Sequence, residues 1–124
     1  MEHPKKILVV DDEVSVIKIL TKKLSEEGFL VDACYDGQEA LLKVEREKPD
    51  LILLDIIMPK LDGISVLKKL KQSEETKDIP IMILTNLYDD EKMVEVLKAG
   101  NTDYLIKVEH TINEIIRRVK QKLT

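Results

Sequence analysis

Five short apolar runs recur along the chain at nearly even intervals, and their spacing restricts the possible folds more than any other feature. The runs are Ile7 to Val10, Phe29 to Ala33, Leu51 to Leu54, Ile81 to Leu84 and Tyr104 to Ile106. Each has the length of a β-strand. The first, third and fourth runs are continuously apolar, as strands are when helices cover both faces of a parallel sheet. The second run contains Asp32, which predicts a strand at an edge of the sheet.

Segments with helical periodicity lie between the runs and after the last one. The clearest apolar stripe consists of Ile112, Ile115, Ile116, Val119 and Leu123. Its intervals of three and four residues predict an amphipathic helix. Similar stripes predict four earlier helices, and Gly28 suits a left-handed stop for the first of them. Strand and helix therefore alternate, which predicts parallel strands with right-handed crossovers and an α/β fold with a doubly wound sheet.

The size and charge of the chain exclude several classes of protein. Its 124 residues fit one domain, which we take to span residues 1–124. An apolar content of 44% supplies a core, so disorder is not expected. The formal charge of -4 argues against direct binding of nucleic acid or of an anionic membrane. A single cysteine, Cys34, and the absence of a signal segment or membrane-spanning run predict a cytoplasmic protein.

Polar residues follow four of the predicted strands where each strand ends. They are Asp11, Asp12 and Glu13 after the first strand, Asp55 after the third, Thr85 after the fourth and Lys107 after the fifth. In an open parallel sheet, ligands bind beyond the carboxyl ends of the strands. Because neighbouring strands lie about 5 Å apart, side chains at these ends can meet. We therefore expect these residues to form one site.

Carboxylates that lie together need a compensating charge. Either one of them stays protonated with a raised pKa, or a cation joins them, and oxygen ligands without His or Cys suit Mg²⁺. Lys107 can pair with Asp55 or with an arriving anion, while Thr85 offers a hydroxyl group. Asp55 would then be a nucleophile toward phosphorus. Taken singly, these residues have ordinary structural explanations, such as Asp12 capping the first helix.

Several motifs also connect the chain with a known family. In order they are Ile7-Leu8-Val9-Val10-Asp11-Asp12-Glu13, Leu53-Leu54-Asp55-Ile56-Ile57-Met58-Pro59, Leu61-Asp62-Gly63, Ile83-Leu84-Thr85, and Ala99-Gly100 followed by Asp103-Tyr104-Leu105-Ile106-Lys107. Over nearly its whole length the chain resembles the receiver domain of two-component response regulators, of the stand-alone chemotaxis type. The resemblance implies a flavodoxin-like (βα)5 fold with strand order 2-1-3-4-5. Because no output segment follows Thr124, the chain is either a stand-alone receiver or a piece of a longer protein.

The resemblance implies a phosphoryl acceptor and a metal site. Asp55 would accept a phosphoryl group from the phosphohistidine of a sensor histidine kinase or a histidine phosphotransfer protein. Mg²⁺ would be held by Asp12, Asp55 and the Ile57 carbonyl, and by Asp11 largely through water. Such a domain is a signalling switch rather than a conventional enzyme, although it catalyses its own phosphorylation and dephosphorylation.

The resemblance also implies how the signal leaves the site. Thr85 and Lys107 would contact the phosphoryl oxygens, and Tyr104 would turn inward as Thr85 moves toward them. The output would be a change at the surface of the fourth helix, fifth strand and fifth helix, which a downstream protein target reads. Neither direct nucleic-acid binding nor membrane binding is expected, and a phosphorylation-dependent homodimer is left open.

The sequence departs from the family's pattern at two positions beside the expected site. Val108 stands where a proline, often reached through a cis peptide bond, usually follows the lysine, so we predict a trans Lys107–Val108 bond and a rearranged loop. Asn86 stands where a small residue usually follows the threonine, and we favour partial shielding of the entrance over a hydrogen bond to the phosphoryl group. Two other positions on the rim of the expected site are Ile57 and Leu87, which cannot orient a water molecule, so we expect slow hydrolysis of the aspartyl phosphate.

Three other functions compete with this one. A magnesium phosphohydrolase of the haloacid dehalogenase type would have Asp-x-Asp after the first strand, whereas this chain has Asp11-Asp12-Glu13. A receiver-like binding module that is no longer phosphorylated is the main alternative, against which the retained charged residues argue. A nucleotide-binding domain is least favoured, because the first strand-to-helix turn has no glycine-rich cradle.

Overall fold

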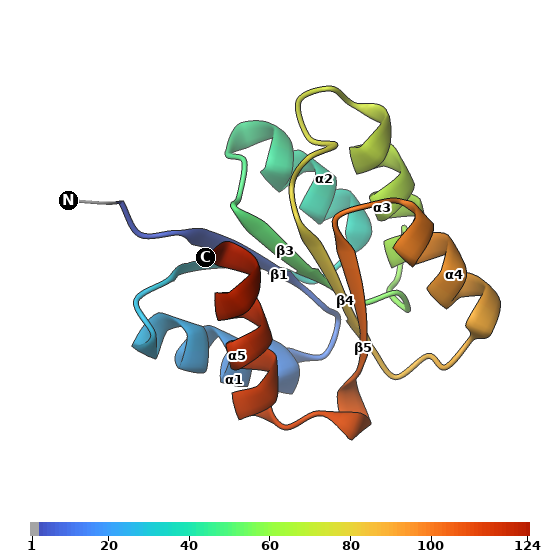
Figure 1. Ribbon diagram of the computed structural model, residues 1–124. Helices are drawn as coiled ribbons and strands as arrows, with labels where there is room; N and C mark the ends of the chain where they lie inside the picture. The colour runs from blue at the N-terminus through green and yellow to red at the C-terminus, as the bar shows by residue number, and fades with distance from the viewer. Residues whose placement is uncertain (1–2) are drawn as a thin grey trace.

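A single parallel sheet with strand order β2-β1-β3-β4-β5 organises the chain (Figure 1). The computed structural model describes residues 3–124. Its strands are β1 (Lys6–Val10), β2 (Leu30–Cys34), β3 (Leu51–Leu54), β4 (Ile81–Thr85) and β5 (Thr102–Ile106). This topology confirms the doubly wound α/β fold and places β2 at an edge, as the mixed pattern of its sequence predicted.

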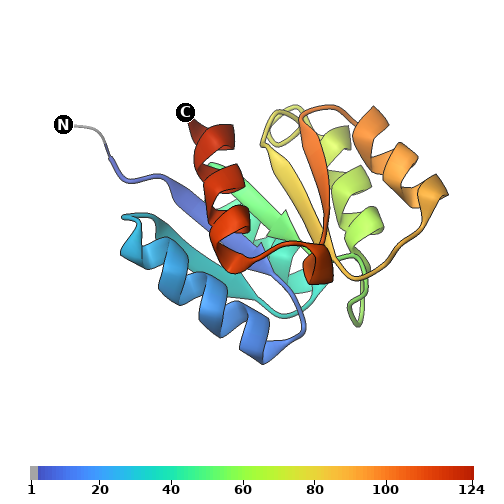
Figure 2. The same ribbon diagram turned by 60° about the horizontal axis from the view of Figure 1, so that its bottom comes forward.

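Helices follow all five strands and cover both faces of the sheet. They are α1 (Val14–Glu26), α2 (Gly37–Arg46), α3 (Gly63–Gln72), α4 (Asp90–Lys98) and α5 (Ile112–Leu123), and a short 3-10 turn, η1 (Lys107–Glu109), precedes the last one. Helices α1 and α5 lie on one face, and α2, α3 and α4 lie on the other (Figures 1 and 2). Of the helices described, none combines the length and apolar character needed to cross a bilayer.

The two faces of the sheet explain why the central strands are continuously apolar. Ile7 and Val9 pack with α1 and α5, whereas Leu8 and Val10 pack with α2 and α3 in a second cluster. Successive side chains of a strand point to opposite faces, so a strand covered on both sides needs apolar residues at every position. The core therefore forms two layers, one on each face of the sheet.

Several strand boundaries differ from the predicted ones by one or two residues: β1 begins one residue earlier, at Lys6, and β4 ends one residue later, at Thr85. Strand β2 begins and ends one residue later than predicted, and β5 begins at Thr102 rather than Tyr104. Thr102 pairs with Ile81, and Cys34 pairs with Val10, so backbone hydrogen bonding sets these ends. The apolar pattern of the sequence does not predict backbone pairing of this kind.

Backbone geometry confirms two local predictions. Gly28 has a φ of 94°, the left-handed conformation expected at the end of α1. No cis peptide bond occurs within residues 3–124, so the Lys107–Val108 bond is trans. The next residues form η1. Thr111 then caps the start of α5, and Thr111 and Glu114 together form a capping box.

Two glycines allow the loop after β3 to pass close to the starts of two helices. A Cβ atom at Gly37 would overlap the backbone of Leu61 at one end of the loop. A Cβ atom at Gly63 would overlap the carbonyl oxygen of Asp55 and lie 2.8 Å from Cα of Ile56 at the other end. The Gly63 N–H also donates to the Ile56 carbonyl at 2.8 Å. The backbone beside Asp55 is therefore packed directly against α3.

We predict that Gly63→Ala destabilises the protein by about 1–3 kcal/mol, because the added methyl group must displace the Asp55 backbone. At an open helical position the same change stabilises by about 1 kcal/mol, so the sign of the effect is diagnostic. Urea unfolding gives the free energy of unfolding directly. Lys69→Ala, at an exposed position of the same helix, serves as a control and is expected to change that energy little. A Gly63→Ala protein that is as stable as the native chain would contradict the close packing.

Candidate functional site

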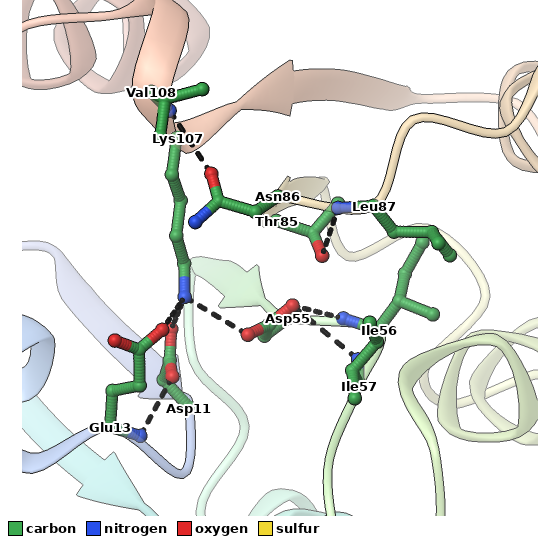
Figure 3. Close-up of polar contacts among 10 residues, drawn as sticks. All are labelled: Asp11, Glu13, Asp55, Ile56, Ile57, Thr85, Asn86, Leu87, Lys107 and Val108. Carbon is green, nitrogen blue, oxygen red and sulfur yellow. Dashed lines mark hydrogen bonds and ion pairs between the residues drawn. The ribbon is translucent and has the colours of Figure 1, made fainter.

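Four strand ends bring their polar residues to one edge of the sheet, as predicted (Figure 3). Asp11 directly follows β1 and Asp55 directly follows β3, the neighbouring strand. Thr85 is the last residue of β4, and Lys107 follows β5 at the sheet edge. The backbone N–H of Asp55 donates to the Val10 carbonyl at 3.0 Å, which ties the ends of β1 and β3 together.

The Lys107 ammonium group lies among three carboxylates. Its Nζ is 2.7 Å from Oδ2 of Asp11, 3.0 Å from Oδ2 of Asp55 and 2.9 Å from Oε1 of Glu13. The side chain is 11% exposed. Burial by itself lowers the pKa of Lys107, but its hydrogen bonds to the three carboxylates outweigh this and raise that pKa. Lys107 therefore remains charged and is the counter-cation of this cluster.

Asp11 and Asp12 have different environments although they are adjacent. Asp11 is buried, and its Oδ1 accepts a hydrogen bond of 2.9 Å from the Glu13 N–H. Burial raises the pKa of Asp11, against the lowering effect of its hydrogen bonds to Lys107 and Glu13. Asp12 is exposed, and it does not cap α1, since Glu13 occupies the cap position without a side-chain hydrogen bond. Its carboxylate is thus available to the site.

The two carboxylate oxygens of Asp55 have different hydrogen-bond partners. Oδ1 accepts a 2.7 Å hydrogen bond from the Ile56 N–H and a longer one of 3.4 Å from the Ile57 N–H, while Oδ2 faces Lys107. The residue is buried, yet it lines a cleft of about 290 Å³. The cleft is lined by Asp12, Glu13, Asp55, Ile57, Thr85, Asn86 and Lys107. An anion entering this cleft reaches a carboxylate whose orientation is already set.

Thr85 and Tyr104 contact the loop after β4 rather than the carboxylates. The Oγ1 atom of the buried Thr85 accepts a hydrogen bond of 3.3 Å from the Leu87 N–H. The Tyr104 hydroxyl donates to the Leu87 carbonyl at 2.6 Å, and its ring packs against the core beside α4. Burial raises the pKa of Tyr104, which keeps this hydroxyl a donor. Both side chains therefore act on one short loop.

Three residues beside the site behave differently from their sequence-based descriptions. Glu13 forms an ion pair with Lys107. Its position after the first strand allows this contact but does not predict it. Asn86 accepts a hydrogen bond of 3.1 Å from the Val108 N–H, in addition to lining the cleft. The side chain of Leu87 packs against the core and is not part of the cleft lining, whereas Ile57 is 61% exposed at the rim.

The acidic residues fit a hard divalent cation. Within the described residues, carboxylate oxygens of Asp11, Asp12 and Asp55 lie within 4.8 Å of one another. Mg²⁺ prefers oxygen ligands, binds through one or two carboxylates and keeps several waters. The exposed position of Asp12 leaves one side of the cluster open to such waters. The donor set and its partial exposure therefore suit Mg²⁺.

Comparison with known proteins identifies relatives over nearly the whole chain. The family model described as the response regulator receiver domain matches residues 7–120. The alkaline phosphatase synthesis transcriptional regulatory protein PhoP of Bacillus subtilis is 46% identical over 116 residues, covering 94% of this chain and 47% of that protein. A probable transcriptional regulator, ycf27, of Guillardia theta is 39% identical over 98% of this chain and 49% of its own length. The chain thus spans about half the length of these relatives.

Solved structures give the same result. The Francisella response regulator 1452 receiver domain superimposes with a TM-score of 0.86 at 37% identity, covering 96% of each chain. The Vibrio cholerae chemotaxis protein CheY4 superimposes with a TM-score of 0.88 at 29% identity, covering 98% of this chain and all of that one. The family model, the sequence relatives and the solved structures agree, and the chain belongs to the response regulator receiver domain family.

Proposed function

We propose that Asp55 accepts a phosphoryl group from the phosphohistidine of a sensor histidine kinase or histidine phosphotransfer protein. A carboxylate oxygen of Asp55 forms a bond to phosphorus as the bond from phosphorus to the imidazole nitrogen breaks. The imidazole leaves with the bonding electron pair. The observation that carries this proposal is the oriented Asp55 carboxylate, which lines an open cleft and is paired with Lys107.

The chain's own residues supply positioning and charge for this transfer. The Ile56 N–H donates to Oδ1 of Asp55 and fixes its orientation. The Lys107 ammonium group contacts Oδ2 of Asp55 and would also stabilise the negative charge on the phosphoryl oxygens during transfer. The Thr85 hydroxyl would move to donate a hydrogen bond to a phosphoryl oxygen, and this movement would break the bond that it accepts from the Leu87 N–H. Mg²⁺ held by Asp11, Asp12, Asp55 and the Ile57 carbonyl would neutralise charge on the phosphoryl oxygens.

Loss of the hydrogen bond from the Leu87 N–H to Thr85 would connect the site with the output surface. Because Tyr104 donates to the carbonyl of the same residue, movement of Thr85 would alter the bond that holds the tyrosine in its present position. Tyr104 lies on β5, beside α4. The proposed output is therefore a change in the surface formed by α4, β5 and α5, with Tyr104 as the switch.

Response regulators interact with histidine kinases and downstream targets. We propose that this domain, residues 1–124, does so in the cytoplasm, recognises a protein target and makes no direct contact with nucleic acid. Its net charge of -4 supports the last point. PhoP of Bacillus subtilis is a transcriptional regulatory protein about twice as long as this chain, so DNA binding in such a protein can lie outside the matched part. A phosphorylation-silent binding module is not favoured, since every charged residue of the site is in place.

Phosphorylation at Asp55 is tested by intact mass after incubation with Mg²⁺ and acetyl phosphate. We expect the native chain to gain one phosphoryl group that is stable in acid and labile in base. Asp55→Asn should gain none, because an amide is not a nucleophile toward phosphorus. Asp90→Asn, an exposed carboxylate at the start of α4, is the matched control and should behave as the native chain. Equal phosphorylation of the Asp55→Asn protein would exclude Asp55 as the acceptor.

The metal site is tested by titrating the native chain and Asp12→Asn with Mg²⁺ under calorimetric or NMR observation. We predict that Asp12→Asn weakens Mg²⁺ binding at least about tenfold, because a carboxylate ligand is lost. Asp12 is exposed, so the variant should remain as stable as the native chain. Asp90→Asn again provides the control. Unchanged affinity in Asp12→Asn would remove this residue from the site.

The lifetime of the aspartyl phosphate is tested at Ile57, which lies at the cleft rim and cannot hydrogen-bond water. We predict that Ile57→Asn shortens this lifetime severalfold, because an amide there can orient the attacking water. Decay is followed by intact mass after removal of the phosphodonor. Leu42→Asn, at a similarly exposed apolar position on α2, controls for the added amide. If both variants decay at the native rate, the apolar rim does not slow hydrolysis.

A further inference from the structure

The two positions at which the sequence departs from the family's pattern are joined by a hydrogen bond. The backbone N–H of Val108 donates to Oδ1 of Asn86 at 3.1 Å (Figure 3). Proline has no N–H, so this bond requires another residue type at position 108. It also requires a side-chain acceptor at position 86, which a small apolar residue would not supply. The two departures thus complement each other chemically.

Apart from the ion pairs of the Lys107 side chain, little else holds the turn η1 in place, so this bond matters. None of its residues is buried, and Val108 is 81% exposed. The contacts of His110 with the turn are local: its N–H donates to the Lys107 carbonyl at a long 3.4 Å, and its Nδ1 lies 3.0 Å from the Ile106 carbonyl oxygen. Across the part of the chain described, Asn86 supplies the one side-chain hydrogen bond from another element to the backbone of η1.

The placement of this turn sets the placement of the Lys107 ammonium group. Lys107 is the first residue of η1, and its side chain must pass the end of β4 to reach Asp55 beyond β3 and Asp11 beyond β1. A long side chain has many rotamers, so its reach depends on a stationary backbone. Asn86 follows β4 directly, which is the strand between Lys107 and Asp55.

We propose that Asn86 is a positioning residue that acts through Lys107. Its side-chain carbonyl anchors the Val108 N–H and so keeps the ammonium group over Asp11 and Asp55, in a loop that lacks the family's proline. This inference deepens the proposed phosphoryl transfer and rests on it for its consequence in rate. The geometric part concerns the unphosphorylated protein and is tested separately.

The first test is amide hydrogen exchange at Val108, together with the NMR signal of the Lys107 ammonium group. Asn86→Ala should accelerate Val108 exchange by about tenfold and change the Lys107 signal, since the acceptor is lost. Asn86→Asp retains Oδ1 and should keep Val108 protected. Val108→Ala retains the N–H and controls for the exposed side chain. Asn86 is exposed, so all three variants should fold, which thermal unfolding verifies.

The second test asks whether Asn86 acts through Lys107. Asn86→Ala should slow phosphorylation by acetyl phosphate about threefold to tenfold in the native chain, and should have no further effect in a Lys107→Ala background. An equal change of rate in both backgrounds, slower or faster, would show that Asn86 acts on the anion or the entrance instead, and would overturn the proposal. Native exchange at Val108 in Asn86→Ala would also overturn it. If the native chain is not phosphorylated at all, the proposed function fails, while the exchange data still decide the positioning role.

Discussion

Charge balance between Lys107 and two buried carboxylates is the interaction on which the site depends. Asp11 and Asp55 follow neighbouring strands, and their buried carboxylates would repel each other because little water screens them. The ammonium group contacts both and removes that repulsion. The exposed Asp12 adds a third carboxylate on the side open to solvent, which suits a hydrated cation. Because the carboxylates still outnumber the single ammonium group, an arriving anion would need a bound cation to offset their charge.

The sheet and its two packed faces make this balance possible. Apolar residues on both sides of each central strand hold the strand ends in register, and the hydrogen bond from the Gly63 N–H to the Ile56 carbonyl attaches the start of the loop after β3 to α3. The loop after β4 is less firmly embedded and is held by hydrogen bonds from Tyr104 and to Thr85. A fixed Asp55 beside a loop with exchangeable hydrogen bonds is the arrangement that the proposed phosphoryl-driven switch would use.

Much of this was predictable from local pattern, and the misses have physical causes. Continuous apolar runs predicted that the central strands are buried on both faces. The glycine at position 28 predicted the left-handed end of α1. The polar start of β5 at Thr102 was missed, because pairing with Ile81 rather than apolar character extends that strand. The Leu87 side chain was placed at the rim but packs inward, since the direction of a loop side chain depends on the core beneath it.

The amino-acid pattern alone was enough to specify alternating strands and helices, acidic residues at the strand ends, and a lysine after the last strand, because each follows from periodicity and from residue type. Contacts between distant segments were decided by the folded chain. Glu13 joining Lys107, and Asn86 receiving the Val108 N–H, depend on the reach of side chains across strands separated in sequence. A linear sequence carries residue chemistry but not those distances, which exist once the sheet has assembled.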